Sequence, residues 1–198
     1  VTSWLDKTLW PAVALLAAVL MGLALPASAQ REAISSALSP EVAAEAFTDA
    51  VLNTCISAAA GNGVSGLPPG VRSRLQSSSD AETRRQAGAT ANETVWDVLA
   101  AKGVVVVHER PGRCVVSVYG PPAMQTVMGL AGRLTAQQPQ PFERLVSAPP
   151  PNGYGQSLMK IENGKRIMVQ LAGSEPGAPG HKSRFSVVTA TVFATPAG

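Results

Sequence analysis

The sequence predicts an α+β domain with a mostly antiparallel sheet of about five strands, two main helices packed on one face and one helix-to-sheet disulfide. Three observations lead to this fold class. Apolar residues recur at helical spacing over 40–60 and 120–138. Much of the remaining chain alternates apolar and polar residues, as half-buried strands do. Short turn sequences connect neighbouring stretches into hairpins, and hairpin connections give antiparallel pairing.

Residues 1–29 have the three zones of a cleavable export signal. A weakly positive head precedes an uncharged apolar run at 9–25. The small residues Ala27 and Ala29 then form the Ala-x-Ala pattern that signal peptidase reads, so cleavage is expected before Gln30. The alternative is an uncleaved membrane anchor, but the apolar run is shorter than the roughly 20 residues that cross a bilayer. The sequence therefore predicts a periplasmic or secreted protein without membrane attachment after cleavage.

The mature chain should begin with a flexible N-terminus at 30–39, followed by a single α+β domain at 40–198. Ser39 is expected to cap a helix that starts with Pro40, because serine is a preferred N-cap and proline is tolerated in the first turn. This helix should continue to about residue 60, where Gly61 stops it. Its predicted apolar stripe consists of Ala43, Ala46, Phe47, Ala50, Val51, Thr54, Cys55 and Ala58.

Residues 61–93 are expected to form an irregular loop with a short helix near 80–87. Residues 61–66 match the letters G-x-G-x-x-G of dinucleotide sites. That motif needs a strand before it and a helix after it, so that phosphates meet a helix N-terminus. Here a predicted helix precedes the glycines and Leu-Pro-Pro-Gly follows them. A helix stop with a flexible loop is the favoured interpretation, and no cofactor is expected.

The rest of the chain should supply the strands and the second helix. Asn163-Gly164 is the strongest hairpin signal, and it places Glu162 opposite Lys165 as a plausible ion pair. The segment 94–101 fits either a short helix or a strand. The helix at about 120–138 should carry Met124, Val127, Met128, Ala131 and Leu134 on one side. The predicted strands are 104–109, 114–119, 142–147, 156–162, 165–171 and 184–194.

The two cysteines, Cys55 and Cys114, are expected to form a disulfide, because an exported protein folds in an oxidising compartment. Cys55 shares its helical stripe with Phe47 and Val51, and Cys114 begins an alternating strand, so both sulfurs should point into the core. The alternative is two buried free thiols. A metal site is not expected, since it would need more ligands than two distant cysteines and two distant histidines.

His108 is the one weak candidate for catalysis. It is predicted to lie near the end of an apolar strand, on the face opposite to Val107 and Glu109. The functional interpretation is an acid/base group or a ligand contact. The alternative, which we favour, is a half-exposed residue at a strand end. A serine triad can be assembled on paper from Ser65 or Ser79 with His108 and Asp97, but no G-x-S-x-G elbow is present.

Charge and composition argue against nucleic-acid partners. The chain of 198 residues has a formal net charge of +3, and its basic residues are scattered rather than clustered. Aromatic residues make up only 5% of the chain, so there is little material for base-stacking platforms.

Three segments resemble small uncharacterised periplasmic proteins of Gram-negative bacteria. They are the Phe47…Cys55 helix after a signal peptide, the Trp96…Gly103 segment and the strand Cys114-Val115-Val116-Ser117-Val118. The resemblance covers about residues 40–120. It implies an envelope compartment and a helix-to-strand disulfide, and it brings no catalytic residue with it.

The sequence therefore predicts an exported cell-envelope protein that acts as a non-enzymatic binding or interaction module. Its partner would be another envelope protein or a small ligand. The alternative is a periplasmic hydrolase with a site near His108. Self-association through an exposed sheet edge is a third possibility.

Overall fold

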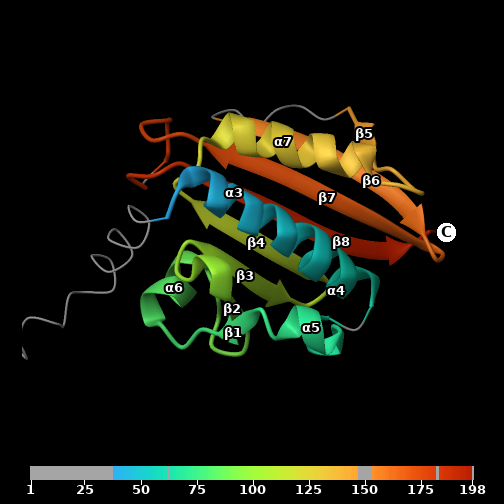
Figure 1. Cartoon of the computed structure of the whole chain (residues 1–198), viewed down its shortest axis with the longest axis horizontal. Helices are drawn as coiled ribbons and strands as arrows, with labels where there is room; N and C mark the ends of the chain where they lie inside the picture. The colour runs from blue at the N-terminus through green and yellow to red at the C-terminus, as the bar shows by residue number, and fades with distance from the viewer. Residues whose placement is uncertain (1–37, 62, 147–152, 182, 198) are drawn as a thin grey trace, which may run out of the picture.

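One antiparallel sheet of eight strands runs through the structure, in the order β1-β2-β3-β4-β8-β7-β6-β5 (Figure 1). The computed structural model describes residues 38–61, 63–146, 153–181 and 183–197, so the predicted signal and its cleavage site at Ala27, Ala29 and Gln30 lie outside the described residues. The strands are β1 (Leu75–Ser77), β2 (Thr94–Val98), β3 (Val105–Arg110), β4 (Arg113–Tyr119), β5 (Glu143–Leu145), β6 (Tyr154–Glu162), β7 (Lys165–Ser174) and β8 (Val187–Pro196).

The α+β class and the antiparallel pairing are confirmed, but the prediction of about five strands is wrong. β1 was missed because it has three residues, too few for an alternating pattern to show. The sequence of β2 fits both a helix and a strand, since a short apolar run is compatible with either. Both belong to the β1–β4 half of the sheet, where each strand follows its neighbour along the chain.

The first helical segment begins and ends where the sequence predicts. It consists of α3 (Pro40–Asp49), a π-helical stretch η1 (Ala50–Cys55) and α4 (Ile56–Ala60). The Ser39 hydroxyl accepts a hydrogen bond from the Val42 N–H at 3.3 Å, as an N-cap should. The π-helical stretch has no sequence signal, since its apolar spacing resembles that of an ordinary helix.

The second main helix, α7 (Ala123–Ala136), buries Val127, Ala131 and Leu134 of its predicted side, but the prediction is wrong for Met124 and Met128. Met124 and Met128 are 49% and 47% exposed. The reason is a close approach between α7 and β7 at Gly173, where an added Cβ would lie 3.1 Å from the Ala123 side chain. The small residue Ala123 therefore faces the sheet. The buried residues of α7 are Ala123, Thr126, Val127, Leu130, Ala131 and Leu134.

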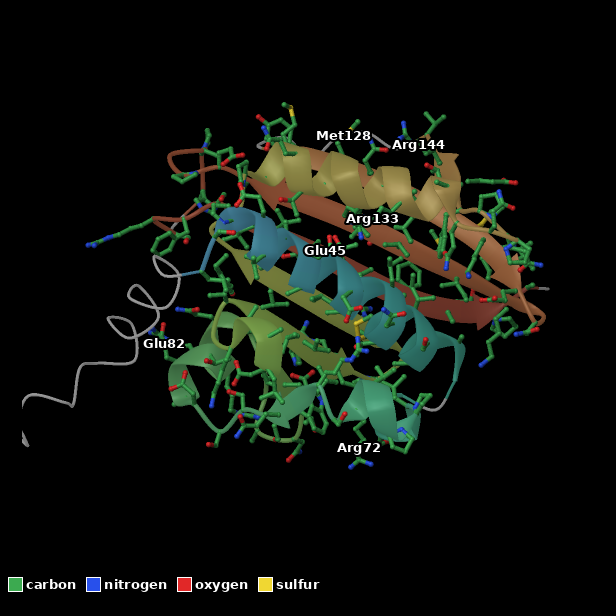
Figure 2. The ribbon with its side chains drawn as sticks, in the orientation of Figure 1. Glu45, Arg72, Glu82, Met128, Arg133 and Arg144 are labelled. Carbon is green, nitrogen blue, oxygen red and sulfur yellow. A yellow bond between two sulfur atoms is a disulfide. The ribbon has the colours of Figure 1, made fainter. Side chains whose placement is uncertain are left out.

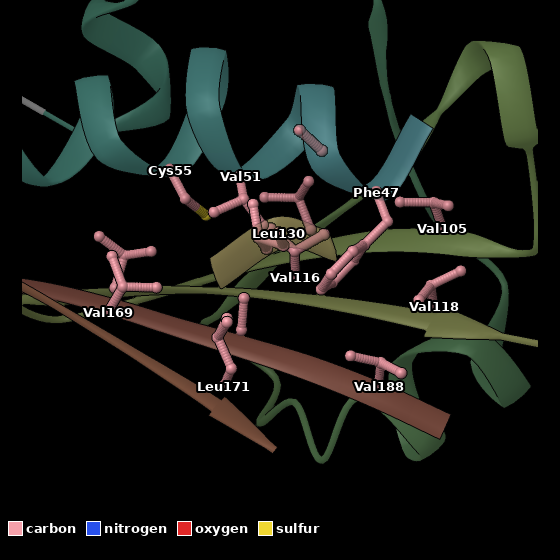
Figure 3. Close-up of a cluster of buried hydrophobic side chains, with 14 of the residues drawn as sticks. Phe47, Val51, Cys55, Val105, Val116, Val118, Leu130, Val169, Leu171 and Val188 are labelled. Atoms are coloured by element: carbon pink, nitrogen blue, oxygen red, sulfur yellow. The ribbon is translucent and has the colours of Figure 1, made fainter. Parts of the chain in front are cut away.

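Both helical segments cover the same face of the sheet, with α3 to α4 over the middle strands and α7 over β6 and β7 (Figure 1). The two helices are also joined directly, because the Arg133 guanidinium donates to both carboxylate oxygens of Glu45 at 3.0 and 2.6 Å (Figure 2). Phe47, Val51 and Cys55 point from the first helical segment into the core beneath it (Figure 3). None of the described helices is long and apolar enough to cross a membrane.

The predicted disulfide is confirmed. Cys55 and Cys114 are bonded with their Cα atoms 5.3 Å apart, and the two residues are 0% and 2% exposed. The bond joins the end of η1 to the start of β4 and so ties the first helical segment to the centre of the sheet.

The Asn163-Gly164 turn has the predicted register, but the predicted ion pair is wrong. Glu162 lies opposite Lys165, and both turn residues have positive φ, as a two-residue hairpin turn requires. The Lys165 ammonium instead donates to the Ala60 carbonyl at 2.7 Å, which closes the end of α4. Glu162 pairs with Lys160 at 3.0 Å.

The segment expected to be irregular, 61–93, contains short ordered elements besides β1. They are η2 (Val64–Gly66), α5 (Pro69–Arg72) and α6 (Ala81–Gln86), and η3 (Leu99–Ala101) follows β2. α6 forms where the short helix was predicted, with the Asp80 carboxylate accepting from the Thr83 N–H at 2.7 Å.

Candidate functional site

A cleft of about 630 Å³ surrounds the tip of the β3–β4 hairpin. This volume is within the usual range for small-molecule sites. The disulfide contributes Cys114 to its wall, and the glycine loop after α4 contributes Gly61 and Gly63. Its polar lining residues are Thr90, Asn92, Glu93, Thr94, Glu109, Arg110 and Arg113.

Glu109 occupies the glycine loop that resembles a dinucleotide motif. Its carboxylate accepts a hydrogen bond from the Val64 N–H at 2.9 Å. Gly63 has a φ of 77°, and a Cβ at that position would collide with the Glu109 carboxylate. The loop therefore presents a backbone N–H to an anion, as such glycine loops do, but the anion is a side chain of the protein itself.

Glu93 is the centre of a second set of polar contacts, on the other side of the hairpin. Its carboxylate accepts from the Thr90 N–H at 2.7 Å, lies 3.3 Å from His108 Nε2 and lies 3.5 Å from Arg110 Nε. The Thr90 N–H holds the pKa of the Glu93 carboxyl below its usual value, and the positive charge of Arg110 adds to this effect. The Arg110 guanidinium also donates to the Gly88 carbonyl at 2.7 Å.

His108 is buried, with 2% of the residue exposed, rather than half-exposed as expected. It does lie on the predicted face of β3, opposite to the helices, where the chain from 78 to 93 folds over it. The imidazole is hydrogen-bonded to Glu93 and to the backbone of Ala87. His108 is not among the residues that line the cleft, so its ring does not face a ligand there in this structure.

The structure does not assemble the possible triad of a serine, His108 and Asp97. Asp97 accepts from the Gly103 N–H at 3.3 Å and does not orient His108. The carboxylate beside His108 is Glu93, which sequence reasoning missed because 15 residues separate the two and no motif connects them. Among the residues that the structure describes, no group of three or more His, Cys, Asp or Glu side chains is placed to hold a metal ion.

Lowering the pH from about 7 to about 5.5 is expected to lower the free energy of unfolding through His108. Burial lowers the pKa of the imidazole and Arg110 lowers it further, while Glu93 acts in the opposite direction. The histidine of the unfolded chain titrates near pH 6.5. Below that pH the unfolded state binds the proton more readily, so stability is lost as pH falls towards the folded-state pKa, by at most about 1.4 kcal/mol per pH unit.

Urea unfolding at the two pH values measures this loss. The matched control is His108→Gln, whose neutral side chain cannot titrate and should remove the decline. An equal decline in both proteins would show that other groups cause it.

The second notable surface is the sheet face away from the helices. The chain from 78 to 93 covers only its β2–β3 part, where Val95, Val106 and His108 are buried. The remainder, which we call the open face, is covered by no described helix or strand. It consists of Arg113, Val115, Ser117 and Tyr119 of β4, Val187, Thr189, Thr191, Phe193 and Thr195 of β8, Arg166, Met168, Gln170, Ala172 and Ser174 of β7, Gly155, Ser157, Met159 and Ile161 of β6, and Glu143 and Leu145 of β5.

Burial separates the two faces residue by residue. Three residues of β8 face the helices and are fully buried: Val188, Ala190 and Val192. Thr191 and Phe193, which point to the other face, are only half-buried. All the open-face residues are half-buried or exposed. A phenylalanine and two methionines therefore lie half-buried on this face, and adjoining apolar side chains of this kind are also found on surfaces that bind partners.

Comparisons with protein-family models, with curated proteins and with solved structures find no match to this chain. Functional inference therefore rests on the two surfaces described above. Most polar groups of the cleft form hydrogen bonds or ion pairs with other groups of the protein. The open face, in contrast, is covered by no described helix or strand.

Proposed function

We propose that this protein is an exported, non-enzymatic interaction module of the cell envelope, and that it binds a protein partner through the open face. One observation carries the proposal. Phe193, Met168 and Met159 lie side by side across three strands at half burial, on a face that no described element covers. Burying these side chains against a partner would gain roughly 25 cal/mol for each Å² of apolar surface removed from water.

Export is part of the proposal, supported by the signal pattern at 1–29 and by the disulfide. A bond between two buried cysteines suits an oxidising compartment such as the periplasm or the cell exterior. The antiparallel sheet, held by that bond, would present the open face with little rearrangement, which limits the entropy lost on binding.

The hydrolase alternative would need the 78–93 segment to move away from His108. One specific contact favours it, because Glu93 touches His108 and also lines the cleft. Turnover of an ester, peptide or cell-wall substrate by the purified protein, lost on His108→Ala, would support the hydrolase and contradict a purely binding role.

Photo-crosslinking in the native envelope tests the proposed function. A benzoylphenylalanine replaces Gln170 at the centre of the open face, and a matched probe replaces Gln125, which is also exposed but lies on α7. We expect adducts from position 170 and none from position 125. Adducts only from position 125, or from neither, would contradict binding through the open face.

A further inference from the structure

The open face carries a cross-strand row with opposite charges at its two ends. Arg113 of β4 lies opposite Phe193, Phe193 opposite Met168, and Met168 opposite Met159. Met159 in turn lies opposite Glu143 of β5. Directly opposed residues of antiparallel strands share a face, so the row consists of a cation, three apolar side chains and a carboxylate.

The charges at the two ends do not meet within one molecule. Arg113 and Glu143 are four strand spacings apart, or roughly 19 Å at about 4.8 Å per strand. Neither side chain forms a hydrogen bond or an ion pair with another described residue. The row therefore presents one uncompensated positive and one uncompensated negative end on either side of an apolar centre.

From this pattern we infer that a second copy of the chain covers the open face, in a face-to-face dimer whose two-fold axis runs along β7; the inference rests on the proposed use of that face. A rotation about this axis places the row of the second copy over that of the first with its residues in the opposite order. Arg113 then meets the partner's Glu143, Phe193 meets the partner's Met159, and Met168 meets the partner's Met168. This is the self-complementarity that an isologous interface requires.

The next row along the strands is also complementary to the same row of the partner taken in the opposite order. It consists of Val115, Thr191, Gln170, Ser157 and Leu145, in the order β4-β8-β7-β6-β5. Reversal about β7 places Val115 on the partner's Leu145, Thr191 on the partner's Ser157, and Gln170 on the partner's Gln170. The contacts that result are an apolar pair, a pair of hydroxyls and a pair of amides. No charged residue of this row faces an apolar side chain of the partner.

Packed sheets cross at about 30°, so each β7 strand lies about 15° from the two-fold axis. At two strand spacings from the axis this moves the ends of a row by roughly 5 Å, which arginine and glutamate side chains can span. Four strands of about seven residues and the three-residue β5 occupy roughly 500 Å², so two copies would bury roughly 1,000 Å². That is below the roughly 1,200 Å² of stable, specific interfaces and is typical of weak, transient ones. A dissociation constant in the micromolar range is therefore expected.

One residue opposes the arrangement. Arg166 lies on β7 two residues before Met168, so it would approach the partner's Arg166 close to the axis. It forms no ion pair with a described residue. Replacing Arg166 by serine should therefore lower the dissociation constant of the dimer. Binding of an acidic partner would not become tighter when this positive charge is removed.

Sedimentation velocity of the purified mature protein, from about 1 µM to about 1 mM, tests the inference. We expect a monomer–dimer equilibrium. Arg113→Glu should weaken it by about tenfold or more, because each of the two symmetric attractions becomes a repulsion. The double variant Arg113→Glu with Glu143→Arg should restore it to within about threefold, since the swapped charges again match. The control Arg72→Glu makes the same charge change on α5, away from the open face, and should have little effect.

The thermal unfolding midpoint of each variant, measured at a concentration where it is monomeric, shows whether a variant that fails to dimerise is still folded. A wild-type monomer over the whole concentration range, or a charge swap that fails to restore a lost dimer, would overturn the inference. If position 170 still crosslinks to a different protein, the open face binds that partner and only the dimer is wrong. If the protein stays monomeric and position 170 gives no adducts, both proposals fail.

Discussion

Replacing Phe47 by alanine should lower the free energy of unfolding by about 3 to 5 kcal/mol. Phe47 is 0% exposed and lies between the first helical segment and the sheet (Figure 3). Its removal leaves a cavity that α3 cannot close easily, because the disulfide at Cys55 and the Glu45–Arg133 bridge fix the helix in place. Urea unfolding followed by circular dichroism measures the change.

Phe193→Ala is the matched control, since it removes the same atoms from the opposite face of the sheet. Phe193 is only half-buried, so we expect a loss of about 1 to 2 kcal/mol in the monomer. Equal losses at the two positions would mean that an unseen contact buries Phe193, which would contradict an uncovered face.

Reduction of the Cys55–Cys114 disulfide should lower the free energy of unfolding by about 4 kcal/mol. The two cysteines are 59 positions apart in sequence, and the chain-entropy model gives this value for a loop of that length. The bond also attaches the first helical segment to β4, so its loss should loosen α4 before the β6–β7 hairpin. Unfolding in urea with and without dithiothreitol measures the difference.

A variant with Cys55→Ala and Cys114→Ala shows whether the reductant acts through this bond. Its stability should be the same with and without dithiothreitol. A wild-type loss below about 1 kcal/mol would mean that packing alone holds the helix on the sheet.

The sequence was informative where local chemistry decides the structure. Ser39, Pro40 and Gly61 set the ends of the first helical segment, and Asn163-Gly164 sets a hairpin register. It was misleading where tertiary contacts decide. The close approach of β7 to α7 at Gly173 selects Ala123 over Met124 for the buried side. β1 is ordered by backbone pairing with β2 and has almost no side-chain pattern of its own.

The candidate surfaces were harder to predict than the fold. The cysteine pair was predictable because the export-signal pattern and the predicted directions of the two side chains both favoured a bond. Glu93 was not, since its contacts with His108 and Arg110 depend on how the 78–93 segment folds over β3. The open face arises because the strand order brings β4 and β8 together, and the two strands are separated by 67 residues of sequence between Tyr119 and Val187.

Oxidative footprinting of the four methionines that the structure describes tests the proposed binding surface most directly. Met159 and Met168 lie on the open face, while Met124 and Met128 lie exposed on α7 and serve as internal controls. In cells that express the protein, compared with dilute purified protein, oxidation of Met159 and Met168 should fall several-fold and that of Met124 and Met128 should stay unchanged. Protection of Met124 and Met128 with unchanged oxidation of Met159 and Met168 would place the binding surface on the helices and contradict a role for the open face.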